Sequence, residues 1–205
     1  SLETIGGGKP LGICGSGIVD MLSELFLHGW MDFRGKLNPE ASPKIIRKEG
    51  ELCVSYAPGL NFYQSDIDEF IKTKAAAATM VAYMMNLCGI PMEEVAHFYV
   101  AGAFGTHINK ESAVNIGLYP DMDREQIISL GNASLTGARR LLLERDLLGQ
   151  IEKILGLMQY VQFGAVENFL ELMRAASVFP HMDMSRYPSV AKKLQDHNFV
   201  PNHIQ

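Results

Sequence analysis

The sequence predicts an α/β protein, because segments typical of strands and of helices alternate along the chain. The clearest example begins with an apolar run, Phe98 to Val100, which is typical of a short buried strand. A loop of small residues, Ala101 to Gly105, follows it, and Asn109 then has the character of an N-cap for a helix over Lys110 to Ile116. Glycine in such a turn lets the backbone lie close to a flat ligand. A nucleotide is therefore the leading ligand for this loop, although turns of this kind also occur for packing alone.

The first half of the chain adds two predicted helices and a hairpin. The predicted elements are an amphipathic helix from about Ile18 to a stop at Gly29, a β-hairpin over 44–56 that turns at Glu49-Gly50, and a long helix from Ser65 to a stop near Gly89. Asp68, three residues after Ser65, resembles the second member of a capping box. These elements keep the alternation of strands and helices.

The second half is predicted to be mainly helical. Asp123 and Gln126 resemble a helix cap that is followed by Ile127 and Ile128. Further helices are expected from about 131 to 142, with one apolar face, and over 147–154 and 167–176. The tail from Phe179 to Gln205 has little periodicity and is expected to wrap the surface or to be partly ordered.

Composition excludes several classes of protein. The 205 residues are 47% hydrophobic and 20% charged, which is ordinary for a packed domain. A net charge of −5 with no basic cluster argues against non-specific nucleic-acid binding. No apolar stretch approaches the roughly 20 residues of a membrane span, and the start does not resemble a signal peptide. Because the chain starts without Met, we expect it to be a piece of a longer protein.

The cysteines indicate a reducing compartment. Cys14, Cys53 and Cys88 are odd in number and far apart, which favours free thiols in a cytoplasmic protein over disulfides. They form no cluster with the spacing of an iron–sulfur or zinc site, so no metal ligands are predicted in this chain.

The glycine-rich segment Gly12 to Gly17 fits none of the common motifs. It lacks the third glycine of a dinucleotide fingerprint, the G-K-[ST] of a P-loop and the central nucleophile of a hydrolase elbow. Two interpretations remain open: a backbone anion site at a helix N-terminus, or a turn that only lets the helix pack. Taken alone, the residues slightly favour packing.

Three other side chains are candidates with an ordinary alternative. Lys72 and Lys74 lie near the start of the long helix, where a lysine could reach a phosphate or ribose, although helical lysines mostly face solvent. His107 lies inside the glycine loop, but a lone histidine beside a turn is more often structural.

Four segments together resemble one family. GICGSGIVD, KTKAAAA, YVAGAFGTHIN with IGLYPD, and LGNASLTGARRLLL occur in the order found in the C-terminal region of the reductive activators of corrinoid proteins. These activators belong to the ATPase superfamily of acetate and sugar kinases, heat-shock chaperones and actin. The resemblance covers about residues 12–180 and implies one lobe of an actin-like, ribonuclease-H-like ATPase fold, with a mixed sheet flanked by helices.

The resemblance also implies site residues. The loop at 101–105 is similar to the superfamily's adenosine motif, and the segment 131–138 to the second connecting helix that hinges the two lobes. The residues carried over as nucleotide contacts are Gly102, Ala103, Phe104 and Gly105, with Gly15, Ser16, Gly17 and Lys74 as further candidates. The expected domains are an ATPase lobe over residues 1–178 and a tail over residues 179–205.

What the sequence lacks qualifies the implied function. The superfamily's D-x-G-T phosphate loops and the family's cysteine-rich ferredoxin-type segment are missing from these residues. The resemblance therefore implies the nucleotide-binding lobe of an ATP-dependent activator, whose magnesium and iron–sulfur cluster, [2Fe-2S] or another type, are held elsewhere in the parent. A corrinoid protein or corrinoid-dependent methyltransferase is the implied partner, and a homodimer is a further expectation. The alternatives are a docking or dimerisation module of the same fold and, with least support, a small-molecule kinase.

Overall fold

The computed structural model describes residues 3–163 and 168–196. It confirms the α/β class, with the strands divided between two small sheets rather than joined in one. The antiparallel sheet has the order β1 (Ile45–Lys48), β2 (Glu51–Ala57), β3 (Leu60–Tyr63), and the second sheet pairs β4 (Phe98–Ala101) with β5 (Ile127–Gly131) in parallel. The long helix α2 connects the two sheets in sequence, because β3 ends directly before it and β4 follows it. Its 25 residues span about 37 Å.

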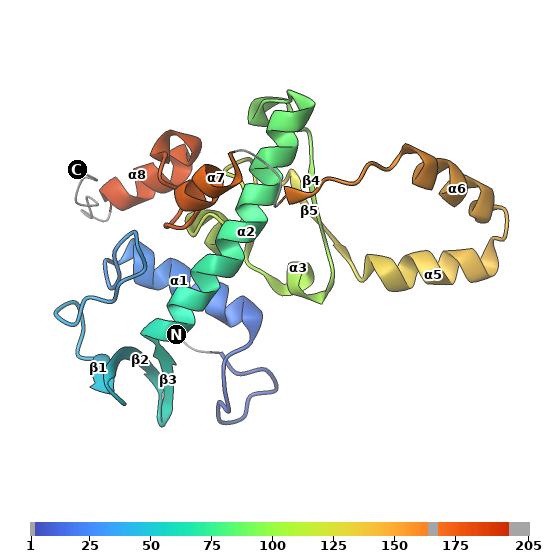
Figure 1. Cartoon of the computed structure of the whole chain (residues 1–205). Coiled ribbons are helices and arrows are strands. Elements are labelled where there is room, and N and C mark those ends of the chain that lie inside the picture. The colour runs from blue at the N-terminus through green and yellow to red at the C-terminus, as the bar shows by residue number, and fades with distance from the viewer. Residues whose placement is uncertain (1–2, 164–167, 197–205) are drawn as a thin grey trace.

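Figure 1 shows the antiparallel sheet at the edge of the molecule, by the start of α2, and β4 and β5 beside the other half of that helix. The helices are α1 (Gly15–Leu27), α2 (Gln64–Cys88), α3 (Ala103–His107), α4 (Lys110–Asn115), α5 (Ala133–Leu143), α6 (Leu147–Leu157), α7 (Phe169–Ala176) and α8 (Pro188–Asp196), with short 3-10 turns η1 (Met92–Glu94) and η3 (Met184–Arg186). Figure 1 shows α2 crossing the centre of the molecule, while α5 and α6 project away from it. Within the described ranges, no helix has the length and apolarity that crossing a membrane requires.

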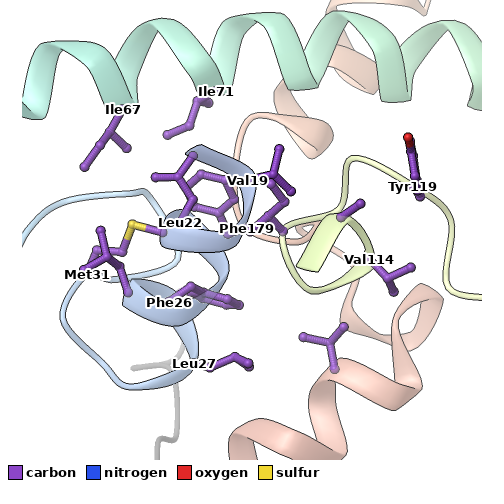
Figure 2. Packing of buried hydrophobic residues seen from close by; sticks show 14 of the residues in the cluster. Val19, Leu22, Phe26, Leu27, Met31, Ile67, Ile71, Val114, Tyr119 and Phe179 are labelled. Atoms are coloured by element: carbon purple, nitrogen blue, oxygen red, sulfur yellow. The ribbon is translucent and has the colours of Figure 1, made fainter. Parts of the chain in front are cut away.

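The core forms where α1 meets α2 and the C-terminal segment. Leu22 and Phe26 of α1 are completely buried, and Ile67 of α2 packs in the same cluster. Figure 2 shows these side chains pointing toward one another, with Phe179 between the two helices. The predicted apolar face of the first helix is therefore confirmed. Its burial supplies the hydrophobic free energy that holds α1 in place.

The predicted hairpin is confirmed, and the predicted start of the long helix is wrong. Glu49 and Gly50 both have positive φ, 54° and 91°, as a two-residue hairpin turn requires. Helix α2 begins at Gln64, and its cap is the Asp66 carboxylate, which accepts from the Tyr63 N–H at 2.9 Å. Ser65 instead bonds to the Glu51 carboxylate, which holds the helix start against β2.

The segment after Asp123 is a strand, which corrects the predicted helix cap. The Asp123 side chain accepts from the Glu125 N–H at 3.0 Å, and this closes a turn. Ile127 then pairs with Phe98 of β4 and is 1% exposed. Two adjacent β-branched residues fit this pairing better than a helix.

The C-terminal segment takes part in the core, although its sequence shows little periodicity. Phe179, Tyr187, Val190 and Leu194 are all buried in the main cluster. Residues 179–196 therefore pack into the main cluster, and the assignment of a tail over residues 179–205 that packs on the lobe or is partly ordered stays a prediction. Glu167 and residues 197–205 lie outside the described residues, and the division at residue 178 stays a prediction.

Candidate functional site

The two parallel strands end side by side in glycines with left-handed backbone angles. Gly102 follows β4 with φ 97°, Gly131 ends β5 with φ 61°, and the Gly102 N–H donates to the Gly131 carbonyl at 2.7 Å. A helix follows each glycine, α3 after the first and α5 after the second. The carboxyl ends of parallel strands are where α/β proteins bind ligands, so this edge is the candidate site.

Gly102 leaves backbone open at this edge. Apart from its chain neighbours, no atom of the described residues lies within 4 Å of the position where a Cβ would stand, which leaves room for a flat ligand to approach the Cα. The polar groups of Gly102 are already satisfied, because its N–H is used by Gly131 and its carbonyl accepts from the Thr106 hydroxyl at 3.1 Å. The position therefore offers an apolar surface for a ring and does not offer free hydrogen-bonding groups.

Gly105 has a different reason to be glycine. It is buried, and a Cβ there would collide with the Val100 side chain on β4. Gly105 therefore lets α3 pack directly on β4, and this close packing sets the position of the backbone that follows Gly102. The expected loop is partly helical, since Ala103 and Gly105 lie in the five-residue α3. The side chains of Ala103 and Phe104 lie outside the described residues.

The second predicted group, Gly15 to Gly17, forms the first turn of α1. Cys14 is the N-cap, and its Sγ lies 3.2 Å from the Ser16 hydroxyl. This hydrogen bond, with one from the Gly17 N–H, lowers the pKa of the Cys14 thiol. A Cβ at Gly17 would stand 3.0 Å from the Ile13 side chain, so packing accounts for this glycine. Helix α1 contacts α3, which brings the two predicted groups to the same region of the molecule.

Lys74 is buried, which overturns the expectation that it faces solvent. It is 1% exposed, and its Nζ donates to the carbonyls of Ala176 and Val178 at 2.7 Å and of Pro180 at 2.5 Å. All three ammonium hydrogens are used in this way, so Lys74 has none left for a phosphate. We therefore remove Lys74 from the nucleotide contacts. Lys72 is exposed as expected and pairs with Glu69 at 2.5 Å.

A family model decides the identity of the chain. The model described as the C-terminal domain of RACo, the ASKHA domain, matches residues 1–191.

The chain belongs to this family.

Relatives and a solved structure agree with the assignment to the RACo C-terminal family. Corrinoid activation enzyme RamQ of Eubacterium limosum is 27% identical over 200 residues, 86% of this chain and 32% of its own length. The [Co(II) methylated amine-specific corrinoid protein] reductase of Methanosarcina barkeri is 30% identical over 150 residues, 72% of this chain and 25% of its own. A solved reductive activator for corrinoid, iron–sulfur protein superposes with a TM-score of 0.84 at 34% identity, over 92% of this chain and 31% of that one.

These similarities establish the fold, and they cover only part of the related proteins. The chain has the actin-like ATPase fold of the RACo C-terminal family. It spans between a quarter and a third of the length of the proteins that it matches. The activity of the whole protein is therefore a matter for proposal.

Gly131 is a residue of the site that the sequence analysis did not select as a contact. The signal was present, because Ile127 to Gly131 followed by Asn132 repeats the strand, glycine and helix-cap order of the first loop. The interpretation of Asp123 as a helix cap concealed the strand. The cap at Asn132 itself is present, since its side chain accepts from the Leu135 N–H at 3.0 Å.

In the part of the chain that the structure describes, the cysteines do not gather into a metal-binding group. The three cysteines are free, and Cys53 is buried in β2 while Cys14 and Cys88 are exposed on α1's N-cap and the end of α2. In residues 3–163 and 168–196, no three His, Cys, Asp or Glu side chains gather as a metal site would require. A cluster with four cysteine ligands does not fit these residues.

Proposed function

We propose that this chain is the nucleotide-binding part of an ATP-dependent reductive activator of corrinoid proteins. One observation supports the nucleotide site above all: Gly102 and Gly131 end neighbouring parallel strands, and Gly102 presents bare backbone there. Membership of the RACo C-terminal family and the names of its relatives support the activator role.

In the proposed complex, the adenosine of ATP lies against Gly102. The backbone of Ala103 and Phe104 continues the same wall, and Gly105 keeps that wall close to β4. The first turn of α1, Gly15 to Gly17, is a second contact for negative charge, because its N–H groups and helix dipole favour anions. Magnesium, which would neutralise the phosphates, is held by residues outside this chain.

The proposed reaction delivers one electron to the Co(II) form of the corrinoid. The electron comes from an iron–sulfur cluster in another part of the parent, because the three cysteines here do not fit one. ATP contributes by stabilising a closed state of the two lobes, and this differential binding shifts the population toward the state that transfers the electron. A corrinoid protein or corrinoid-dependent methyltransferase is the proposed partner, in the cytoplasm, with a homodimer as a further expectation.

The helices α5 and α6 are proposed to join the two lobes. We call this pair with its connection, residues 133–157, the arm. None of its side chains is buried within the chain, although several are apolar. Leu142 is 85% exposed and Leu157 is 82% exposed. An apolar surface of this kind is usually covered. The proposed cover is the remaining part of the ATPase, since the relatives are three to four times longer than the region matched.

Calorimetric titration of the full-length protein with ATP tests the nucleotide site. Gly102→Val should weaken ATP binding at least tenfold, about 1.4 kcal/mol, because a branched side chain occupies the surface that the ring needs. Gly59→Val is the matched control: Gly59 also has a positive φ, 78°, and open space, but it lies in the β2–β3 turn. The control should bind ATP as the wild type does.

The same titration separates the activator from the docking module. A parent protein that binds no ATP would favour the docking alternative. Met80 and Met84 on α2, with Met182 in the C-terminal segment, are between 41% and 49% exposed and would belong to its contact surface. Equal ATP affinity in the two glycine variants would remove the site from Gly102 while leaving the activator role open.

A further inference from the structure

Lys74 occupies a cage of three backbone carbonyls. Ala176 is the last residue of α7, and Val178 and Pro180 lie in the bends that follow it; the carbonyl of each accepts from the same Nζ at 2.5–2.7 Å. The Phe179 ring centroid lies 6.0 Å from the Nζ, at the outer limit of a cation–π contact. The lysine thus has ligands of the kind that a small monovalent cation takes.

The donors and acceptors of the cage match in number. An ammonium group has three hydrogens and no acceptor, and three carbonyl oxygens face it. No backbone N–H in the described residues donates to these oxygens, and Ala176, Val178 and Pro180 are all buried. A buried carbonyl without a hydrogen-bond donor costs free energy, so residues 176–180 stay buried only while Lys74 donates to their carbonyls. The end of α7 also favours a cation, because Ala176 is its last residue.

The cage lies at the point where the chain returns from the arm. The outgoing end is held by the hydrogen bond from Gly102 to Gly131, before α5 begins. The returning end is held on α2 through Lys74, while the Phe179 N–H donates to the Phe33 carbonyl at 2.7 Å. Figure 1 shows α7 beside α2 while α5 and α6 extend away. The two fixed points therefore bracket α5 and α6, neither of which has a buried residue.

We propose that Lys74 is an internal cation that positions the returning end of the arm, holding residues 176–180 on α2 independently of the contacts that α5 and α6 make. The lysine does the work of a bound monovalent ion but is carried by the chain itself. The C-terminal segment then stays in the core, whatever position the arm takes. This role does not depend on nucleotide binding.

Amide hydrogen exchange on the full-length protein tests the proposal. Lys74→Met keeps the length of the side chain and removes the three donors. It should raise exchange at least tenfold at amides of residues 169–196 and leave residues 45–63, in the antiparallel sheet, unchanged. Lys72→Met is the matched control, since Lys72 lies two residues earlier on the same helix and is exposed. It should leave both regions unchanged.

Two results would overturn the positioning role. One is unchanged exchange over residues 169–196 in Lys74→Met. The other is an equal rise across the whole chain, because that would indicate general destabilisation. Should the variant not fold, the wild-type protein decides: a small acylating reagent should label Lys74 at least tenfold more slowly than Lys72. Equal labelling rates would contradict the cage.

Discussion

Gly117 shows how a single residue lets the C-terminal segment enter the core. It follows α4 with φ 72°, and a Cβ on it would collide with the carbonyl group of Pro180. The same Pro180 carbonyl accepts a hydrogen bond from Lys74. The lack of a side chain at Gly117 and the hydrogen bond from the Lys74 side chain thus both position the Pro180 carbonyl.

Gly117→Ala should be markedly destabilising. The left-handed conformation costs about 1–2 kcal/mol for alanine, and the collision adds a further cost, for a total of about 3 kcal/mol. Gly89→Ala is the control, because Gly89 also has a positive φ, 64°, but nothing lies within 4 Å of its Cβ position. It should lose only about 1 kcal/mol. Urea unfolding measures both, and equal losses would show that the close contact with Pro180 has no cost.

Lys74 should make stability depend on pH. Burial lowers its pKa from 10.5 to about 7 in the folded protein. Burial alone means that, between these values, the unfolded chain binds a proton that the folded chain has released, so the wild type should gain stability relative to Lys74→Met as the pH rises from 7 to 10.5. The three carbonyls of the cage accept from the protonated amine and oppose this gain. His181 also interacts with Lys74, but its own pKa is lowered, mainly by burial, and it titrates below this range. Urea unfolding at several pH values measures the difference. If the stability difference between wild type and Lys74→Met does not change with pH, the three carbonyls stabilise the ammonium form enough to cancel the effect of burial on the pKa of Lys74.

At the scale of elements, the same residue type caps two helices with different consequences. Asn109 accepts from the N–H groups of Glu111 and Ser112 at 2.9 and 3.2 Å, and the helix it caps, α4, is largely buried. Asn132 caps α5, which has no buried side chain. A cap contributes to global stability only where its helix packs on the core.

Asn109→Ala should therefore lower the free energy of unfolding by about 1 kcal/mol. Asn132→Ala should leave it unchanged in this chain and should raise amide exchange in α5 alone. Urea unfolding with amide exchange on both variants measures this. Equal losses of global stability would mean that the arm packs on the core in solution.

A charge network fastens α8 to α4. Arg124 donates to the Glu111 carboxylate at 2.7 Å and to Asp121 at 2.9 Å, and Lys193 of α8 also pairs with Glu111. The Ser189 hydroxyl bonds to Asp121, which brings the start of α8 into the same network. The Arg124 hydrogen bond is the main reason that the pKa of Glu111 falls from 4.5 to about 2.

Glu111→Gln should cost about 1 kcal/mol at pH 7, a value discounted because the Glu111 side chain is 43% exposed. The pKa is lower in the folded chain, so this stability is present above the ordinary value of 4.5 and is lost as the pH falls toward 2. Thermal unfolding at pH 7 and near pH 2 compares the variant with the wild type. A difference that persists at pH 2 would mean that packing rather than charge is responsible.

For the whole molecule, local signals predicted the elements better than their partners. The turn at Glu49-Gly50, the cap at Asn109 and the stop at Gly89 are set by nearby residues, and all three are confirmed. The cage of Lys74 joins residues more than 100 positions apart, so no local pattern could indicate it. The same limit concealed the pairing of β5 with β4 and the burial of α8.

The candidate site was predicted in part for the same reason. Glycine after a strand is a local pattern that indicates the loop at 101–105, and the family resemblance implies Gly102 as a contact within it. Gly131, its neighbour in space, required knowledge of which strands pair. The difference between Gly102, which is open, and Gly105, which packs on Val100, is likewise visible only in three dimensions.

The uncovered arm leads to a prediction for the full-length protein. Leu157, at the end of α6, is 82% exposed in this chain, yet the helix carries apolar residues around it. If the rest of the ATPase covers the arm, Leu157→Gln in the full-length protein should cost about 2 kcal/mol, because a buried leucine is replaced by a polar side chain. Glu152→Gln on the same helix should change stability by less than about 0.5 kcal/mol. Denaturant unfolding monitored by circular dichroism, together with amide exchange over 147–157, measures both variants. If Leu157→Gln leaves the free energy of unfolding unchanged and amides in α6 exchange fast, the arm is exposed in the full-length protein. The proposed closure of the lobes would then need another hinge.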